Sequence, residues 1–186
     1  MPIRPAAAQD APAIADIYNH YVRETVITFA CRDIDAAHFA AQIAEGKYPF
    51  LVAESGEAVV GFAYASEFRQ KDAFRWDTEL TIYLAPGMER QGAGSRLMGA
   101  LLRILKRQGY LTAYSCVTLP NEGSLRLHRR FGFTKLGIFP KTGYKLGRWC
   151  DVIWLQLPLG RHDSEPAEPR PFASLSADDI QALLAE

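Results

Sequence analysis

Apolar side chains at helical spacing predict two helices in the N-terminal third of the chain. In residues 7–23 and again in residues 33–46, apolar positions recur every three or four residues, as in a helix with one buried face. Asp10 is a candidate N-cap for the first helix, and Gly46 is placed to end the second. A short strand is predicted before them, at residues 2–6.

Most of the remaining chain shows the inward–outward alternation of β-strands. Residues 50–54 and 58–68 flank a Ser-Gly pair, which predicts a hairpin. Residues 77–86 alternate leucine and isoleucine with glutamate, threonine and tyrosine, so this strand has two distinct faces. Three more strands are predicted at residues 110–119, 133–139 and 148–159, with the glycine-punctuated residues 140–147 connecting the last two.

The stretch at residues 89–109, ERQGAGSRLMGALLRILKRQG, joins the central strand to the longest predicted helix. Gly92 and Gly94 open it, a stripe of leucine and isoleucine follows, and Gly109 is placed to end it. A shorter helix is predicted at residues 121–132, between two strands. Strands and helices therefore alternate only around the glycine turn.

This order of elements predicts a mixed α/β fold with helices packed on a sheet, in one domain that spans residues 1–160. Residues 161–186 differ, because a proline-rich polar linker is followed by a short C-terminal helix. Ser176 and Asp179 have the spacing of a capping box at the start of that helix. Such a short helix is not stable alone, so we expect it to dock on this domain or on a neighbouring subunit.

Composition and charge exclude several classes of protein. The 186 residues carry 21 Lys+Arg against 21 Asp+Glu, which does not favour a nucleic-acid binder. The cysteines, Cys31, Cys116 and Cys150, are widely spaced and predict reduced thiols rather than disulfides or a zinc site, and no histidine–carboxylate cluster suggests another metal. Without a secretory signal or a membrane-spanning apolar run, we expect a cytoplasmic protein with no membrane partner.

The glycine turn has the features of an anion site. The first N–H groups of a helix have no partner within it, glycines let a ligand approach them, and the helix dipole favours negative charge. Arg90 and Ser95 add a cation and a hydroxyl, so the turn is a candidate pyrophosphate cradle. It lacks the lysine of a P-loop and the third glycine of a dinucleotide fingerprint. Tight packing of strand on helix is the alternative explanation for Gly92 and Gly94.

Several motifs in order resemble the GCN5-related N-acetyltransferases, abbreviated GNAT. That family has a Q/R-x-x-G-x-G/A turn between a central strand and a long helix, and residues 89–94 read ERQGAG. NEGSLRLHRRFGF at residues 121–133 resembles the family's later helix. DAFRWDTELTIYLAP and GYKLGRWCDVIWLQL resemble the phosphinothricin and methionine sulfone N-acetyltransferase branch. The resemblance implies the GNAT fold, a mostly antiparallel sheet of about seven strands whose central strands splay, flanked by about four helices.

The resemblance also implies acetyl-CoA as co-substrate. Glu89 departs from the usual Gln or Arg at the first motif position, but a cradle of N–H groups does not depend on that side chain. By resemblance, the coenzyme contacts are the main chain of Ile82, Tyr83 and Leu84, the pyrophosphate turn of Arg90, Gln91, Gly92, Ala93, Gly94 and Ser95, and Asn121.

Two residues are candidates for proton transfer. Glu79 lies on the central strand among apolar residues, and the resemblance favours it as the general base; its spacing alone equally allows a salt bridge with Arg75. His128 occupies the helical position from which the family donates a proton to the coenzyme sulfur, although a hydrogen-bonded helix histidine is as reasonable. Tyr83 is a weaker candidate for the same step.

The acceptor is expected to be the primary amine of a small L-amino-acid-like molecule. Arg75 and the main chain near Phe74 are candidates to bind its carboxylate, and by resemblance Phe29 lines the pocket. From sequence alone, a core aromatic is the better explanation of Phe29. Two alternatives stay open: a GNAT enzyme acting on a protein N-terminus or a polyamine, and an acetyl-CoA-binding sensor without turnover. The resemblance further implies a homodimer.

Overall fold

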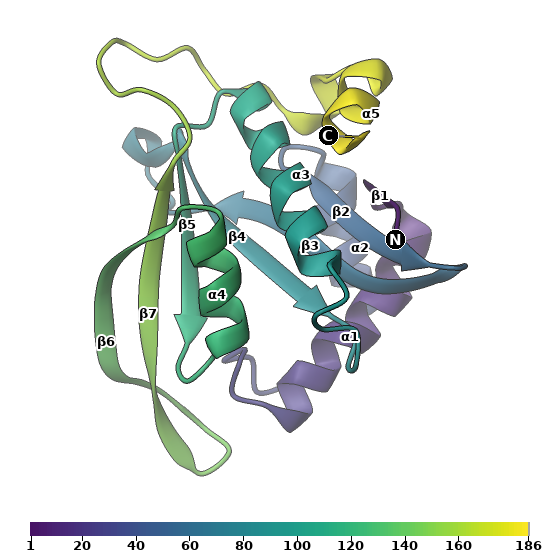
Figure 1. Ribbon diagram of the computed structural model, residues 1–186, viewed down its shortest axis with the longest axis vertical. Coiled ribbons are helices and arrows are strands. Elements are labelled where there is room, and N and C mark those ends of the chain that lie inside the picture. The colour runs from purple at the N-terminus through teal and green to yellow at the C-terminus, as the bar shows by residue number, and fades with distance from the viewer. Residues whose placement is uncertain (186) are drawn as a thin grey trace.

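The computed structural model describes residues 1–185, and within them a single sheet of seven strands runs through the molecule (Figure 1). The spatial order of the strands is β1-β2-β3-β4-β5-β7-β6. Their bounds are β1 Ile3–Pro5, β2 Phe50–Ser55, β3 Ala58–Glu67, β4 Asp77–Leu84, β5 Thr112–Thr118, β6 Thr134–Lys145 and β7 Arg148–Pro158. The predicted mostly antiparallel sheet is confirmed.

The sheet opens in its middle, between β4 and β5. These two strands form the sheet's parallel pair, and their register covers only Asp77–Glu79 against Thr112–Tyr114. Past that point β4 pairs only with β3, up to Leu84, while β5 pairs only with β7, up to Thr118. The facing edges of β4 and β5 are therefore left without strand partners, as the resemblance predicted.

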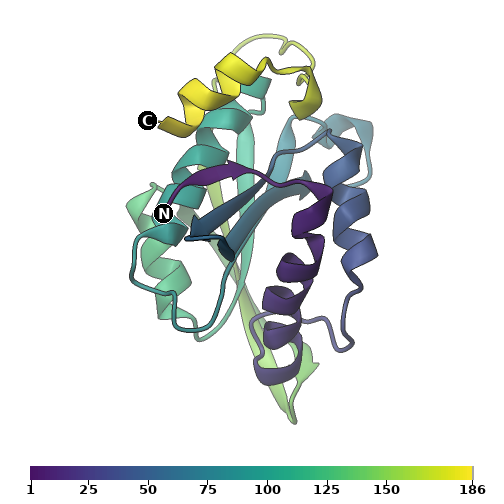
Figure 2. The ribbon, with the colours of Figure 1, turned by 90° about the vertical axis from the view of Figure 1, so that its right-hand side faces the viewer.

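The two faces of the sheet are covered by different pairs of helices (Figure 2). On one face, α1 (Ala11–Glu24) and α2 (Ala36–Glu45) pack on an aromatic core that contains Phe39, Phe50 and Phe62. On the other, α3 (Ala93–Gln108) packs over β2, β3 and β4, and α4 (Glu122–Arg130) lies beside it in front of β5 (Figure 1). The leucine stripe of α3 is buried in this second core, as its spacing predicted.

Asp10 precedes α1 as expected, but its carboxylate does not cap that helix. It accepts two hydrogen bonds from the Arg4 guanidinium, at 2.7 and 2.9 Å, and one from the Ala7 N–H at 2.8 Å. Asp10 is therefore the N-cap residue of α1 by position, as predicted, but its side chain makes no capping hydrogen bond, because the carboxylate is held by the arginine beside it.

The segment 140–147 is a second correction. It was predicted to connect two strands, but β6 continues to Lys145 and only the turn at Leu146 and Gly147 joins it to β7. A bulge between Phe139 and Gly143 interrupts the pairing with β7. β6 lies at the edge of the sheet, where such irregularity is tolerated.

The tail folds back onto α3. Its helix α5 (Ala177–Ala185) begins as predicted, since Ser176 Oγ accepts the Asp179 N–H at 3.0 Å and lies 3.0 Å from its carboxylate. Arg107 of α3 forms a 3.0 Å ion pair with Asp179, and Leu175 is buried in the α3 core. The tail therefore docks on its own domain (Figure 2).

Candidate active site

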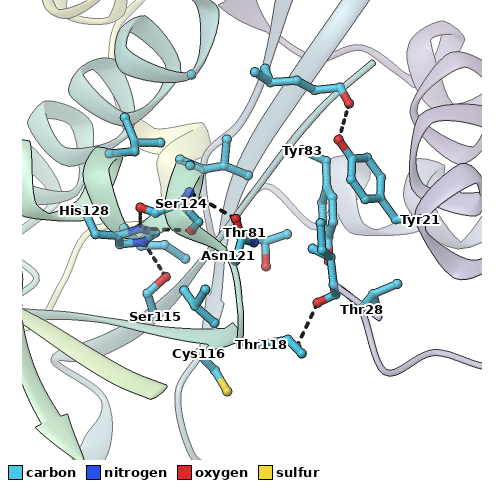
Figure 3. A pocket seen from close by; sticks show the side chains of 18 of the residues that line it. Tyr21, Thr28, Thr81, Tyr83, Ser115, Cys116, Thr118, Asn121, Ser124 and His128 are labelled. Atoms are coloured by element: carbon cyan, nitrogen blue, oxygen red, sulfur yellow. Dashed lines mark hydrogen bonds between the residues drawn. The ribbon is translucent and has the colours of Figure 1, made fainter. Parts of the chain in front are cut away.

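A cavity of about 720 Å³ lies where β4 and β5 separate. One side is formed by the glycine turn and the start of α4, and the other by α1 and the segment that follows it (Figures 1 and 3). Its lining includes Tyr21, Thr28, Phe29, Glu79, Ile82, Tyr83, Leu84, Arg90, Gly92, Gly94, Ser95, Ser115, Cys116, Asn121 and His128. Most of the predicted site residues are thus brought to one place.

The glycine turn is shaped so that N–H groups face outward at the start of α3. Arg90 and Gly92 both have left-handed backbone, with φ of 62° and 91°, and a Cβ on Gly92 would meet nothing within 4 Å. The first bond of the α3 ladder runs from the Arg96 N–H to the Gly92 carbonyl at 3.1 Å. The N–H groups of Ala93 to Ser95 precede that ladder and have no partner within the helix, which is the arrangement that an anion cradle requires.

Two residues of the turn lie outside the cavity lining. The side-chain amide of Gln91 donates to the Gly87 carbonyl at 3.0 Å, and the side chain of Ala93 is fully buried in the core. We therefore expect Gln91 and Ala93 to contact the coenzyme through their main chain and not through their side chains. Two cations that the sequence analysis did not single out, Arg126 and Arg130 of α4, line the cavity instead.

The edge of β4 gives the cavity unpaired main-chain groups. Ile82, Tyr83 and Leu84 all line it, beyond the last residue that pairs with β5. The Leu84 carbonyl is already used, because it accepts the Tyr21 hydroxyl at 2.7 Å. Asn121 lines the cavity next to the turn, and its side-chain oxygen caps α4 by accepting the Ser124 N–H at 3.1 Å.

His128 is buried and hydrogen-bonded at both ring nitrogens. Nδ1 lies 2.8 Å from the Ser124 carbonyl, which only accepts, so Nδ1 carries the proton. Burial lowers the pKa of His128, which favours the neutral ring. Nε2 of that ring then accepts the Ser115 hydroxyl at 2.8 Å (Figure 3). His128 is therefore a hydrogen-bonded helix histidine that also lines the cavity, and its role as a proton donor stays a prediction.

Glu79 lies half-buried on β4 at the point where the parallel pairing ends. Burial raises the pKa of its carboxyl, and the charge of Arg69 opposes that shift. Among the described residues no cation forms an ion pair with Glu79. Arg75 instead pairs with Glu168 of the tail at 2.7 Å, so the alternative of an Arg75–Glu79 salt bridge was wrong.

The residues predicted for the acceptor divide into two groups. Phe29 lines the cavity and is 37% exposed, so it is not a core aromatic. Phe74 and Arg75 lie outside the lining: Phe74 packs edge-on against Phe68, and Arg75 is held by Glu168. The structure therefore does not bring the predicted carboxylate clamp to the cavity.

Tyr83 packs at the base of the cavity among other aromatic side chains. Its ring contacts Tyr18 edge-on at 5.2 Å and Tyr21 at 4.9 Å, measured between centroids. Burial is the largest cause that raises the pKa of its phenol, so the group stays protonated. This arrangement fits the packing role more closely than proton donation to a thiolate.

Sequence reasoning missed Ser115, Cys116 and Arg69. Ser115 and Cys116 are neighbours on β5, so their side chains leave opposite faces: Ser115 points to His128, and the Cys116 sulfur points away (Figure 3). Arg69 lies over the Phe68 and Trp154 rings, and its charge acts on both Glu79 and Cys116. Two single residues on a strand and one in the loop after β3 carry no motif that could have identified them.

Two structural findings complete the description of residues 1–185. Their histidine, cysteine and carboxylate side chains form no group of three or more that could hold a metal ion. None of their helices combines the length and apolar character that a membrane crossing requires.

Comparison with known proteins gives the site its family. The family model described as "Acetyltransferase (GNAT) domain" matches residues 3–154. The chain is 37% identical over 163 residues to a phosphinothricin N-acetyltransferase of Streptomyces coelicolor, covering 84% of this chain and 95% of the relative. It is 34% identical over 171 residues to an L-methionine sulfoximine/L-methionine sulfone acetyltransferase of Salmonella typhimurium, covering 90% and 99%.

A solved structure agrees with these relatives. The phosphinothricin acetyltransferase of Sinorhizobium meliloti, determined in complex with acetyl-CoA, superposes with a TM-score of 0.85 at 33% identity, covering 89% of this chain and 92% of that one. The chain therefore shares its fold with an enzyme whose structure was determined with acetyl-CoA. The chain belongs to the GNAT family and is an acetyltransferase with acetyl-CoA as its co-substrate.

Proposed function

We propose that the enzyme acetylates the primary amine of a small L-amino-acid-like acceptor of the phosphinothricin, methionine sulfone or methionine sulfoximine type. The names of the similar enzymes point to this acceptor class. The observation that carries the proposal is Glu79, a carboxylate without an ion-pair partner among the described residues, at the mouth of the opening between β4 and β5.

The residues proposed to hold acetyl-CoA fit an extended anionic molecule. The N–H groups at the start of α3 would hold the pyrophosphate, with Arg90, Arg126 and Arg130 as nearby cations. The exposed edge of β4, Ile82 to Leu84, offers main-chain groups to the pantetheine arm. Asn121, at the start of α4, offers a further polar contact.

Glu79 is proposed as the general base, directly or through a water molecule. An amine attacks the thioester carbonyl only after it has lost a proton, and a carboxylate with a raised pKa is a stronger base than an exposed one. The amine nitrogen then bonds to the acetyl carbon, the bond from carbon to sulfur breaks, and the electron pair leaves with the coenzyme thiolate.

The Ser115–His128 pair is proposed to return a proton to that thiolate. With the ring neutral, the Ser115 hydroxyl donates to Nε2. A proton taken up from solvent at Nε2 would reverse this bond: Nε2–H then donates its proton to Ser115 as the hydroxyl passes its own proton to the sulfur, and the ring returns to its neutral form. Because burial lowers the pKa of His128, its cation is a stronger acid than an exposed imidazolium. In this proposal His128 acts through Ser115 and not by direct contact.

For the acceptor carboxylate, Arg69 is proposed in place of Arg75, although neither arginine belongs to the cavity lining. The charge of Arg69 acts on Glu79 and Cys116, two residues of the cavity lining, whereas Arg75 is paired with Glu168. The Arg69 guanidinium lies over the Trp154 ring, 5.4 Å from its centroid, and donates one hydrogen bond to the Phe68 carbonyl at 3.0 Å, so its other N–H groups are the ones proposed for the carboxylate. Phe29 is proposed to contact the side chain of the acceptor.

A homodimer is proposed through the β6–β7 hairpin. This edge of the sheet carries several large exposed hydrophobic side chains: Leu136, Ile138, Phe139, Tyr144, Leu146 and Trp149. Exposed apolar patches of this kind mark interaction sites. Sedimentation velocity of the wild type and of Trp149→Glu tests it, with a dimer expected for the first and a monomer for the second; a monomeric wild type would overturn it.

Two further proposals concern organisation and location. We propose that the GNAT domain ends near residue 160 and that residues 161–186 form an appended strap, since the family match ends at residue 154. We also propose a cytoplasmic location, which is supported by three cysteines that are all free thiols, as in a reducing compartment.

Release of free thiol from acetyl-CoA tests the acceptor class. The panel contains L-phosphinothricin, L-methionine sulfone, L-methionine sulfoximine, a polyamine and a peptide with a free N-terminus. We expect turnover of at least one amino-acid analogue, with a specificity constant at least about tenfold above those of the polyamine and the peptide. Preferred turnover of the peptide or the polyamine would replace the proposed acceptor, and coenzyme binding without any turnover would favour the sensor.

A further inference from the structure

Part of the cavity wall is a segment without regular structure, residues 25–31, which follows α1. It contributes Ile27, Thr28 and Phe29 to the lining. A segment of this kind keeps its position only through contacts with neighbouring elements. Several of these contacts come from the end of β6, more than 110 residues later in the sequence.

We propose that the end of β6, through Gly143 and Lys145, sets the position of Phe29 and thereby determines which acceptor side chains the enzyme accepts. Neither residue lines the cavity, so both act as positioning residues. The inference rests on the proposed function, because it takes the space beside Phe29 to be the acceptor's.

Gly143 leaves the space that the Phe29 ring occupies. A Cβ built on Gly143 would lie 2.3, 2.4 and 2.7 Å from three carbons of that ring. Real Cβ contacts do not occur below 3.0 Å, so any side chain at this position must move the ring or the strand. The glycine is needed for space and not for its backbone conformation, since its φ is not in the left-handed region.

Lys145 fixes the main chain on both sides of the turn after α1. Its buried ammonium donates to the Thr28 carbonyl at 2.8 Å and to the Tyr21 carbonyl at 3.2 Å. Thr118 at the end of β5 adds a hydrogen bond to the Ile27 carbonyl at 3.2 Å. The carbonyl that Lys145 holds belongs to the residue immediately before Phe29, so the strand controls both the ring and its backbone.

This arrangement connects β6 with selectivity rather than with chemistry. Phe29 is 37% exposed and borders the cavity, so a shift of its ring changes the shape of the space for the acceptor side chain. The three atoms nearest to a Cβ added at Gly143 all belong to Phe29, and none to the glycine turn or α4, which are proposed to hold the coenzyme. Affinity for acetyl-CoA should therefore be insensitive to β6.

The test compares Gly143→Ala with Gly137→Ala, a matched control on the same strand whose added Cβ meets nothing within 4 Å. Specificity constants are measured for acceptors whose side chains differ by single methylene groups. We expect Gly143→Ala to change the ratio between a longer and a shorter acceptor by about tenfold or more, with an unchanged KM for acetyl-CoA. Gly137→Ala should keep the wild-type ratio, and an unchanged ratio in Gly143→Ala would overturn the inference.

Lys145 is tested with Arg and Met substitutions, since Arg retains a cationic donor and Met retains only the length of the side chain. We expect Lys145→Met to raise the KM for the acceptor with little change in kcat. Lys145→Arg should have a KM between those of the wild type and Lys145→Met. A uniform loss of activity with both would instead indicate a purely structural lysine and would overturn this half of the inference.

A spectroscopic readout keeps the inference separate from the proposed function. 4-Fluorophenylalanine is placed at Phe29, and its ¹⁹F resonance is recorded in the wild-type, Gly137→Ala, Gly143→Ala and Lys145→Met backgrounds. We expect the resonance to move only in the last two. If no acceptor is turned over but the resonance moves as expected, the proposed function fails while the positioning of Phe29 stands; a resonance that never moves overturns the positioning.

Discussion

Replacing Glu79 with glutamine removes the proposed base while keeping the size and hydrogen-bonding shape of the side chain. A positioned general base contributes about 10²–10⁴-fold to a rate, which corresponds to about 3–5 kcal/mol of activation free energy. We therefore expect kcat to fall by about that factor at neutral pH. At alkaline pH more of the amine is already deprotonated in solution, so part of the loss should be recovered.

Stability should respond in the opposite sense to activity. Burial raises the folded-state pKa of Glu79 above its ordinary value. The folded state therefore holds this proton more tightly than the unfolded state, and the carboxyl opposes folding as pH rises between its ordinary and raised pKa values. Glutamine has no charge to desolvate, so Glu79→Gln should keep or raise the melting temperature at neutral pH.

The control is Glu54→Gln. The Glu54 carboxylate forms an ion pair with Arg4, with an N–O distance of 2.7 Å, and Glu54 lies outside the cavity lining. We expect this variant to lose about 0.2–1 kcal/mol of stability and no activity. The assays are thiol release over a range of pH and thermal unfolding in the same buffers. A Glu79→Gln enzyme that keeps more than about a tenth of the wild-type kcat, or that loses stability as a broken salt bridge would, refutes the general base.

Three further substitutions test the coenzyme turn, the N-terminal ion pair and the tail. Gly92→Ala places a side chain at φ 91°, a strain of about 1–2 kcal/mol. Calorimetry should therefore show weaker acetyl-CoA binding by this variant. The control, Gly56→Ala at φ 62° in the β2–β3 turn, should lower stability without changing that binding. Asp10→Asn should lower the free energy of unfolding, measured with denaturant, by about 1–3 kcal/mol. Arg4 holds the pKa of Asp10 below its ordinary value. The wild type should therefore lose this stabilisation as pH falls through the lowered pKa, whereas the variant has none to lose. Leu175→Ala should cost about 2–4 kcal/mol of stability with an unchanged KM for either substrate, because Leu175 is buried in the α3 core away from the cavity; an increased KM would connect the tail to the site.

Regular elements were predicted where local chemistry decides them. The leucine stripe predicts α3, and Gly109 predicts where it ends. The φ of 97° at Gly109 is one that glycine adopts readily and other residues do not. The end of β6 was missed because Pro140 and Gly143 resemble a loop, while an edge strand with a bulge tolerates both. Only the sheet order shows that β6 lies at an edge.

The site was predicted where main chain or motif determines it, and missed where distant contacts do. The unpaired N–H groups at the start of α3 were predictable because the glycine turn lies directly before the helix in the sequence. The partner of Arg75 does not, because Glu168 is 93 residues further along the chain. Ser115 was missed for the same reason, since its importance comes from a histidine on another element.

The central claim is that the acetyl group passes directly from the thioester to the amine in the opening between β4 and β5. Ser115, hydrogen-bonded to His128, and Cys116 are both residues of the cavity lining, so transfer through a side chain of the protein is the competing route. The most direct test is a single turnover with acetyl-labelled coenzyme and L-methionine sulfone, quenched at successive times and analysed by intact-protein mass and NMR. Label that moves from coenzyme to the N-acetyl product with no labelled protein at any time is the predicted result. Labelled protein that appears first and decays into product would contradict direct transfer.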